Sequence, residues 1–297
     1  MKDTKIEWAH HTFNPWWGCE KVSPGCAHCY AEAFAKRTGH GVWGSASPRR
    51  FFGEKHWAEP LKWDRAALHA DERPRVFCAS MADVFEDRPD LVEQRRRLFE
   101  TILRTQSLDW LLLTKRPENI ARLWPRALGP YGESMVDLVE LGAHNVWLGT
   151  TVENQEQADL RIPLLLQIPA AVRFLSVEPL LGSVMLPLTA LTGHDGSECP
   201  RSDPGCEGGD EDCHDACESQ PRIHWVIVGG ESGPGARPMH PAWAVSVLEQ
   251  CRAAGVPAFF KQTGSHLARL HGYQDAKGGD LSELPPAWRV REVPSCR

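Results

Sequence analysis

Six short apolar runs, rich in β-branched and aromatic residues, constrain the fold of this chain more than any other feature. They occupy residues 75–80, 109–114, 145–150, 173–177, 224–228 and 257–261. Each run is apolar almost continuously rather than at every second position, which is typical of strands that are covered on both faces. The sequence therefore predicts a parallel sheet flanked by helices.

The stretches between these runs have the periodicity of helices. The helix candidates are residues 90–105, 117–124, 155–167 and 241–254. Repeated alternation of strand and helix predicts an α/β fold with a partial or full (β/α) barrel. We expect one barrel domain over residues 1–264, with a Cys-rich insertion at 193–222 and a peripheral C-terminal extension at 265–297.

Composition and charge exclude several classes of protein. The chain has 42% hydrophobic and 24% charged residues, which excludes wholesale disorder. It has no apolar run near the roughly 18 residues of a spanning helix and no export signal, so we expect a cytoplasmic protein with no membrane partner. A net charge of −6 argues against a broad basic face that coats nucleic acid, although it permits a local basic groove.

Polar residues follow the apolar runs. They are Asp83, Lys115 with Arg116, Glu153 with Asn154, Glu178, Glu231 with Ser232, and Lys261 with Gln262. In α/β barrels the carboxyl ends of the strands meet at one rim, where active sites lie. We interpret these residues as a catalytic rim. The alternative is that the acids and bases pair with one another.

Cys19, Cys26 and Cys29 form a C-x6-C-x2-C array in a loop rich in Gly and Pro. The chain has ten cysteines and no export signal, which favours metal ligands over disulfides. Three thiolates without a fourth favour an iron–sulfur cluster that keeps one iron open. The alternative is zinc, with His28, His10 or His11 as the fourth ligand.

The chain resembles a largely uncharacterised, phage- and prophage-associated family of radical-SAM-like proteins. The motifs that carry the resemblance span about residues 5–264. They are Phe13-Asn14-Pro15-Trp16 with the three cysteines and Tyr30-Ala31, Ser80-Met81-Ala82-Asp83-Val84-Phe85, Leu112-Leu113-Thr114-Lys115-Arg116-Pro117, Leu148-Gly149, Glu153-Asn154, Ser176-Val177-Glu178-Pro179-Leu180-Leu181-Gly182, Val226 to Gly233, Ala236-Arg237-Pro238 and Phe260-Lys261-Gln262.

The resemblance implies a barrel of the radical-SAM type with a [4Fe-4S] cluster on Cys19, Cys26 and Cys29. The open iron would bind S-adenosylmethionine, whose reductive cleavage yields methionine and a 5′-deoxyadenosyl radical that abstracts hydrogen from a substrate. A reductant protein such as flavodoxin or ferredoxin would supply the electron. Two features depart from the common pattern of that superfamily. Its Gly-Gly-Glu motif follows the second strand, whereas Gly229-Gly230-Glu231 follows the sixth apolar run here, so its role in binding the cofactor's amine is not carried over. Its first two cysteines are separated by three residues, and an aromatic residue precedes the last. Here the first gap is six and His28 precedes the last cysteine.

The rim residues are the remaining candidates for the site. We assign catalytic roles to Glu178, Glu231, Asp83 and Lys115, since carboxylates and amines can relay protons or hold charged groups. We expect contacts to the cofactor from Gly229, Gly230, Ser176, Glu153, Asn154, Arg237 and Lys261. Two glycines after a buried strand permit close approach of the backbone to a ligand, although a tight turn explains them equally well.

A second cysteine group, Cys199, Cys206, Cys213 and Cys217, lies in the insertion. A short segment that cannot build its own core favours a metal staple. Structural zinc is the leading interpretation, with an auxiliary iron–sulfur cluster or free thiols as alternatives.

We therefore expect a radical S-adenosylmethionine enzyme whose substrate could be a nucleobase, a nucleotide, a nucleic acid or a small molecule. The alternative from another class is a non-catalytic iron–sulfur or zinc protein that binds a partner or nucleic acid. A metal-dependent hydrolase would need histidine ligands at the strand ends, and the strand-end positions named above contain none.

Overall fold

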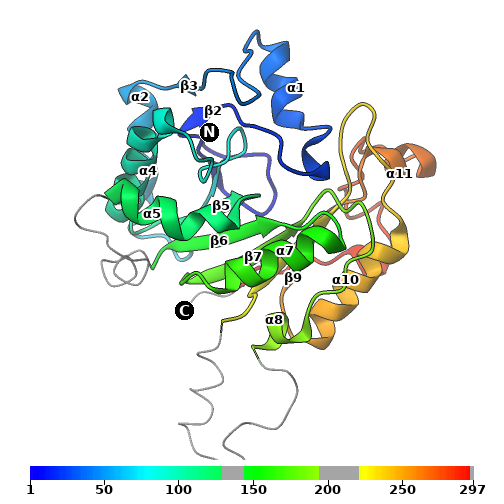
Figure 1. Ribbon diagram of the computed structural model, residues 1–297. Helices are drawn as coiled ribbons and strands as arrows, with labels where there is room; N and C mark the ends of the chain where they lie inside the picture. Colours follow the sequence, from blue (N-terminus) through cyan, green and yellow to red (C-terminus); the bar gives the residue numbers. More distant parts are fainter. Residues whose placement is uncertain (129–143, 194–220, 295–297) are drawn as a thin grey trace, which may run out of the picture.

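The computed structural model describes residues 1–128, 144–193 and 221–294. Its main feature is a seven-stranded parallel sheet that curls into a half barrel (Figure 1). The strands follow chain order: β1 (His11–Thr12), β4 (Arg75–Cys78), β5 (Asp109–Thr114), β6 (Val146–Thr151), β7 (Val172–Val177), β8 (Trp225–Gly229) and β9 (Ala258–Gln262). Because all neighbouring strands are parallel, the carboxyl ends of all seven strands meet at one edge.

Helices connect successive strands. They are α3 (Glu59–Ala67), α4 (Val92–Arg104), α5 (Ile120–Leu128), α7 (Gln155–Leu166), α8 (Leu188–Thr192), α10 (Pro241–Ala253) and, after β9, α11 (Ser265–His271). Short 3-10 turns at Pro89–Leu91, Pro117–Asn119 and Pro286–Trp288 accompany them. The predicted α/β class and partial barrel are thus confirmed, with helix and strand limits within a few residues of those expected.

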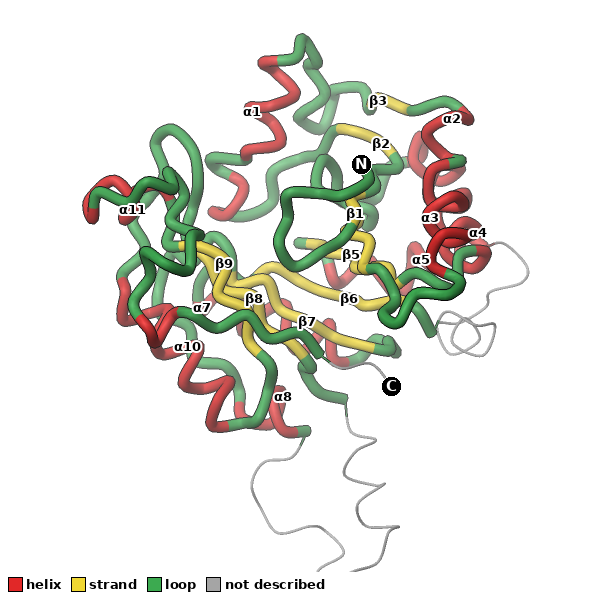
Figure 2. Tube along the Cα trace, turned by 180° about the vertical axis from the view of Figure 1, so that it is seen from behind, coloured by secondary structure: helices red, strands yellow, loops and turns green. Residues whose placement is uncertain are grey.

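A separate group of elements lies at the carboxyl edge of the sheet (Figures 1 and 2). It comprises β2 (Trp16–Trp17), the 3-10 turn Pro24–Cys26, α1 (Tyr30–Arg37), β3 (Arg50–Phe51) and α2 (Glu54–Trp57). Strands β2 and β3 form an antiparallel ribbon outside the main sheet. The apolar runs predicted neither this group nor β1. Strands β1, β2 and β3 have only two residues each, which is too short to form an apolar run.

The two faces of the sheet have separate cores. Side chains that alternate along the strands pack against α4, α5, α7 and α10 on one face. On the other face Trp147, Phe174, Trp225 and Phe259 form a cluster with Trp8, which comes from the N-terminal segment. Trp225 is central, with ring centroids 6.0–6.2 Å from the other four rings. Large apolar side chains therefore fill both faces of the sheet, which explains the continuous apolar runs.

The C-terminal extension lies along the outer edge of β9. Phe260 N–H donates to Val290 O at 2.8 Å, and Glu292 N–H donates to Ala258 O at 2.9 Å. Leu284 and Trp288 are buried in the main core. The segment expected to be peripheral therefore contributes core side chains and covers the edge of the last strand.

The four insertion cysteines Cys199, Cys206, Cys213 and Cys217 lie outside the described residues. The two described ends of the insertion are close, since Ile223 N–H donates to Ala190 O at 2.7 Å. Among the described helices, none combines the length and apolarity needed to cross a membrane.

Candidate functional site

The predicted rim residues do lie together at the carboxyl edge of the sheet. Asp83 follows β4, Lys115 and Arg116 follow β5, Glu153 and Asn154 follow β6, Glu178 follows β7, Glu231 follows β8, and Lys261 and Gln262 end β9. The loop that carries Cys19, Cys26 and Cys29, here called the cysteine loop (residues 18–29), lies over this edge and is fastened to β5, β6 and β8.

The cysteine loop begins at a position that only glycine can occupy. Gly18 bridges to Ala82 beside the end of β4 and has φ +120°, a conformation that L residues rarely adopt. A Cβ at this position would lie 2.4 Å from Val42 O. Close backbone packing therefore positions the chain directly before Cys19.

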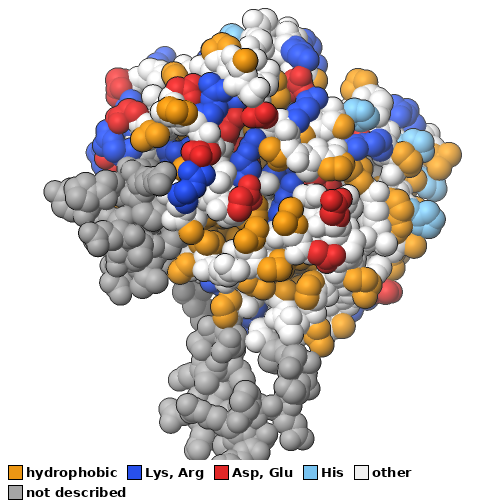
Figure 3. All heavy atoms as spheres, in the orientation of Figure 1, with side chains coloured by type: hydrophobic (Ala, Val, Ile, Leu, Met, Phe, Trp, Pro, Cys, Tyr) orange, Lys and Arg blue, Asp and Glu red, His pale blue; other side chains and the backbone are white. Residues whose placement is uncertain are grey.

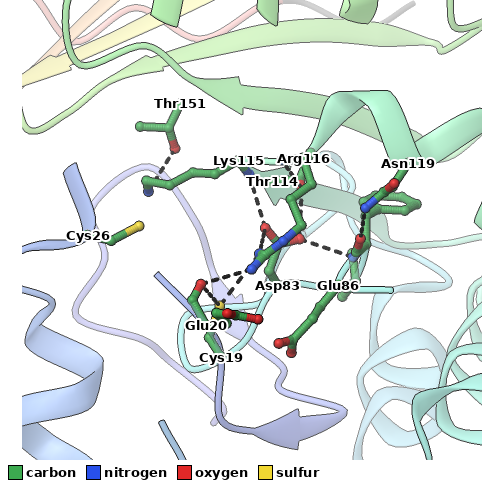
Figure 4. Close-up of polar contacts among 12 residues, drawn as sticks. Cys19, Glu20, Cys26, Asp83, Glu86, Thr114, Lys115, Arg116, Asn119 and Thr151 are labelled. Atoms are coloured by element: carbon green, nitrogen blue, oxygen red, sulfur yellow. Dashed lines mark hydrogen bonds and ion pairs between the residues drawn. The ribbon is translucent and has the colours of Figure 1, made fainter. Parts of the chain in front are cut away.

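Arg116 holds the first part of the loop (Figure 4). Its Nη2 donates to Glu20 O at 2.8 Å, and its Nη1 donates to the Asp83 carboxylate at 2.9 Å and lies 3.7 Å from Cys19 Sγ. Asp83 also accepts hydrogen bonds from Thr114 Oγ1 and from the backbone N–H of Lys115 and Phe85. Because both its oxygens are occupied within the protein, Asp83 positions Arg116.

Glu153 holds the middle of the loop. This fully buried carboxylate accepts a hydrogen bond from Gly25 N–H at 3.0 Å and pairs with Arg161 at 2.9 Å. Burial by itself would raise the pKa of Glu153, but Arg161, Ser23, Lys115 and the Gly25 N–H together lower it. Glu153 is therefore an ionised anchor of the loop.

Glu231 holds the end of the loop. Its carboxylate lies 3.0 Å from His28 Nδ1, and it accepts hydrogen bonds from Arg237 N, Nε and Nη2 at 2.8, 3.0 and 2.6 Å. Burial opposes ionisation of Glu231, but the bonds from Arg237 and His28 lower its pKa overall. With an ionised carboxylate as acceptor, His28 donates from Nδ1.

Glu178, Lys261 and Lys115 provide further charge at the carboxyl edge of the sheet. Lys261 Nζ lies 2.7 and 3.0 Å from the two oxygens of Glu178, and Gln262 Nε2 donates to the same carboxylate at 3.2 Å. Lys115 Nζ donates to Thr151 Oγ1 at 3.2 Å and makes no ion pair with any of the described carboxylates. All three side chains retain some exposure, so they can meet a ligand.

The remaining predicted contacts have structural roles in this arrangement. Asn154 is the N-cap of α7, where Oδ1 accepts from Gln157 N at 3.0 Å. Ser176 is buried within β7. A Cβ on Gly230 would lie 2.1 Å from Thr263 O, and one on Gly229 would lie 3.3 Å from the Glu178 carboxyl carbon. Packing between β8 and its neighbours thus explains both glycines.

A family model described as "Protein of unknown function (DUF5131)" matches residues 3–284. The chain belongs to this family. The match includes the cysteine loop, every rim residue named above and the start of the C-terminal extension, so the site lies entirely inside the DUF5131 region. No curated protein matches the chain.

The DUF5131 cysteine loop presents three free thiols. Cys19, Cys26 and Cys29 are half-buried and form no disulfide. Burial, together with the charge of Asp83, raises the pKa of Cys19 to about 12, and burial raises the pKa of Cys29. Without a metal these two groups are therefore neutral thiols, and ligation would have to displace their protons.

The fit of an iron–sulfur cluster depends on this donor set. Within residues 1–128, 144–193 and 221–294, no three His, Cys, Asp or Glu side chains form a group that could hold a metal ion. A single ion needs ligands that meet at one centre, whereas three cysteines of a cubane bind three different irons. Three free thiols on one loop match the latter donor set in type and number.

Sequence reasoning did not include Arg161 among the site residues and named His28 only as an alternative zinc ligand, although both help to fasten the loop. The feature that could have indicated Arg161 is its position eight residues after Glu153, on the buried face of α7. The signal in His28 is its place between two cysteines, but its partner Glu231 lies 203 residues away and only folding brings the two together.

Proposed function

We propose that this DUF5131 protein is a radical S-adenosylmethionine enzyme that holds a [4Fe-4S] cluster on Cys19, Cys26 and Cys29. The observation that supports this proposal is the position of the cysteine loop, which three separate strand ends fasten over the carboxyl edge of a curled parallel sheet. In (β/α) barrels this edge is where reactions take place.

When bound, the cluster would supply the electron for reductive cleavage of S-adenosylmethionine, which starts hydrogen abstraction from a substrate. The chain's own residues orient the cysteine loop and shield it from water. Arg116, Glu153 and Glu231 hold the loop and its cysteines, and the two buried anchors Arg116 and Glu153 exclude water beneath it. Lys115 can bind an anionic group, and the Glu178–Lys261 pair can bind ligand hydroxyl or amino groups.

The proposal predicts iron in place of zinc. We would purify the protein without oxygen, count iron and sulfide, reduce it, and measure 5′-deoxyadenosine after adding S-adenosylmethionine. In Cys19→Ala, Cys26→Ala and Cys29→Ala variants, the iron of this site and cofactor cleavage should be lost. Cys251→Ala is the matched control, because Cys251 is a buried thiol in α10 that contacts the apolar core.

A variant with Cys199, Cys206, Cys213 and Cys217 changed to Ser separates the two cysteine groups. It should keep the iron that the loop cysteines bind and lose any zinc or auxiliary cluster held by the insertion. Zinc at the loop, or a complete cluster that neither binds nor cleaves S-adenosylmethionine, would contradict the enzyme proposal and favour a non-catalytic metal protein that binds a partner or nucleic acid.

A further inference from the structure

Four charged side chains are buried near Cys19. We call them the Cys19 charge group; it consists of Arg49, Asp83, Glu86 and Arg116, and each is no more than 6% exposed. Arg116 pairs with Asp83 at 2.9 Å, and Arg49 pairs with Glu86 at 2.6 Å. The four residues come from the segment before β3, the loop after β4 and the end of β5. Folding therefore collects two acids and two bases in one buried place.

The charge group contacts Cys19 and the residue before it. Arg116 Nη1 donates to Cys19 Sγ at 3.7 Å, and the same nitrogen donates to Asp83 at 2.9 Å (Figure 4). A Cβ on Gly18 would lie 2.6 Å from Arg49 Cδ, so the Arg49 side chain packs against the backbone that leads into Cys19. Burial raises the pKa of the Cys19 thiol, the charge of Asp83 raises it further, and Arg116 lowers it. Both members of this ion pair therefore act on the sulfur, with opposite signs.

The other two cysteines of the loop have different surroundings. Cys26 Sγ lies 3.9 Å from the neutral hydroxyl of Ser23, and Cys29 is the N-cap of α1. Among the residues that the structure describes, only Cys19 accepts a hydrogen bond from a charged side chain. The charge group is therefore specific to one of the three thiols.

Stabilisation of the fold does not explain the charge group by itself. Removal of four charges from water is costly, and buried ion pairs are often no more stabilising than apolar side chains of the same volume. Acidic and basic side chains also lie together on the upper part of the surface (Figure 3), where water and salt screen them. A buried charge is screened much less and acts strongly on a neighbouring group. Here that neighbour is the Cys19 sulfur, one of the three proposed cluster ligands.

We propose that the Cys19 charge group sets the reduction potential of the iron–sulfur cluster, an inference that rests on the function proposed above. Reduction adds one electron to the cluster and its thiolates, and no other bond forms or breaks. A nearby carboxylate opposes the added negative charge, whereas an N–H group that donates to a ligand sulfur stabilises it. Asp83 therefore makes the cluster a stronger reductant, and Arg116 limits this effect.

The test is a potentiometric titration of the cluster, followed by electron paramagnetic resonance, with dithionite as the reductant and without S-adenosylmethionine. We expect Asp83→Asn to raise the potential and Arg116→Gln to lower it. Each shift should be about tenfold in the one-electron equilibrium constant, which is about 59 mV. In the double variant the two shifts should largely cancel. A role limited to holding the loop would not produce shifts of opposite sign.

The matched control is a second ion pair on the same strand. Arg73 Nε lies 3.1 Å from Asp109 Oδ1 at the start of β5, whereas Arg116 follows its end. Arg73→Gln and Asp109→Asn also remove one charge of a pair each, and the potential should stay unchanged in both. Iron and sulfide counts measure how much cluster each variant holds, and the midpoint potential does not depend on that amount.

The possible outcomes separate this inference from the proposed function. Shifts of the same sign in the two single variants, or shifts no larger than those of the controls, would overturn the inference. Loss of the cluster from both single variants would also overturn it, because the charges would then only hold the loop. Opposite shifts in a protein that does not cleave S-adenosylmethionine would refute the enzyme proposal alone. Cleavage with unshifted potentials would refute this inference alone, and zinc at the loop would refute both.

Discussion

Single carboxylates at the edge of the sheet hold the cysteine loop. Asp83 acts through Arg116, Glu153 binds the Gly25 N–H, and Glu231 binds His28. The sequence marked all three as candidate ligand contacts, because a carboxylate beyond a buried strand must be solvated or paired. The structure pairs them within the protein and leaves Lys115, Glu178 and Lys261 with access to a ligand.

The anchor at Glu153 predicts the effect of a change at Gly25. A Cβ on Gly25 would lie 2.9 Å from Glu153 Oε1, and this carboxylate cannot easily retreat because Arg161 also holds it. In Gly25→Ala the loop should shift and lose its hydrogen bond to Glu153. We expect Cys26 to be alkylated several-fold faster, measured by mass spectrometry of the labelled peptides, with global stability reduced by only about 1 kcal/mol.

Gly41→Ala is the matched control for this prediction. A Cβ on Gly41 meets nothing within 4 Å, and its φ is not positive. Its alkylation rates should equal those of the natural protein. Equal rates in Gly25→Ala as well would show that the contact with Glu153 does not position the loop.

His224 predicts a pH dependence of stability unrelated to the site. Its Nδ1 accepts a hydrogen bond from Arg173 N at 3.0 Å, and burial, followed by the charges of Arg173 and Arg222, lowers the pKa of His224 to about 4. Between the unfolded pKa of about 6.5 and the folded value, the unfolded chain binds a proton that the folded one does not. This group therefore lowers the free energy of unfolding as the pH falls through that window.

The measurement is urea unfolding at about pH 7.5 and about pH 5, for the natural protein and for His224→Asn. Between the two conditions, the free energy of unfolding of the natural protein should fall by up to about 2 kcal/mol more than that of the variant. The comparison isolates His224 from other groups, including Asp109, whose pKa burial raises to about 6. Identical losses would mean that His224 titrates normally in the folded state.

At the scale of elements, the central strands depend on a close fit between β6 and β7. Gly149 in β6 is paired in register with Phe174 in β7, and the Phe174 ring lies over it. A Cβ on Gly149 would lie 2.3 Å from Phe174 Cζ. The glycine in an otherwise bulky apolar run is therefore explained by the neighbouring strand.

Gly149→Ala should destabilise the protein by about 1–3 kcal/mol, because it overpacks a filled core. Phe174→Leu should also destabilise it, by leaving a cavity. The double variant should be more stable than the sum of the two losses, since each change relieves the other. Urea unfolding of the four proteins measures this coupling, and strict additivity would contradict the explanation.

At the scale of the whole molecule, the two ends of the chain complete the sheet. The N-terminal segment provides Trp8 and β1, and the C-terminal extension pairs with β9. Trp288 packs on Phe260 with ring centroids 5.1 Å apart, and Trp225 Nε1 donates to Glu292 O at 2.8 Å. The extension therefore covers a strand edge that could otherwise pair with another chain.

Truncation of the chain after Leu284 should reduce the free energy of unfolding by about 3 kcal/mol or more, because the shorter chain lacks the buried Trp288 and the hydrogen bonds to β9. It should also self-associate through the uncovered edge. Thermal unfolding and light scattering measure the two effects. A chain truncated after Pro294 keeps the same contacts and serves as control; equal behaviour of both would show that the extension does not stabilise the sheet.

The sequence alone determined the strands and their common edge. Residues 109–114 coincide with β5, and the other five apolar runs match strands within a few residues, because burial on both faces leaves a continuous apolar signature. The strand-end polar residues follow from the same reasoning, since parallel strands must end together. The three-cysteine loop was also visible, because its spacing is local in the sequence.

Only the tertiary structure decided what each polar side chain contacts. The sequence could not show that His28 meets Glu231 or that Arg116 approaches Cys19, because these partners lie 203 and 97 residues apart. It also missed the two-residue strands of the β2–β3 ribbon, whose rings and arginines are stabilised by contacts with one another and not by a periodic pattern. Local patterns record burial, whereas pairing between distant side chains exists only once the chain has folded.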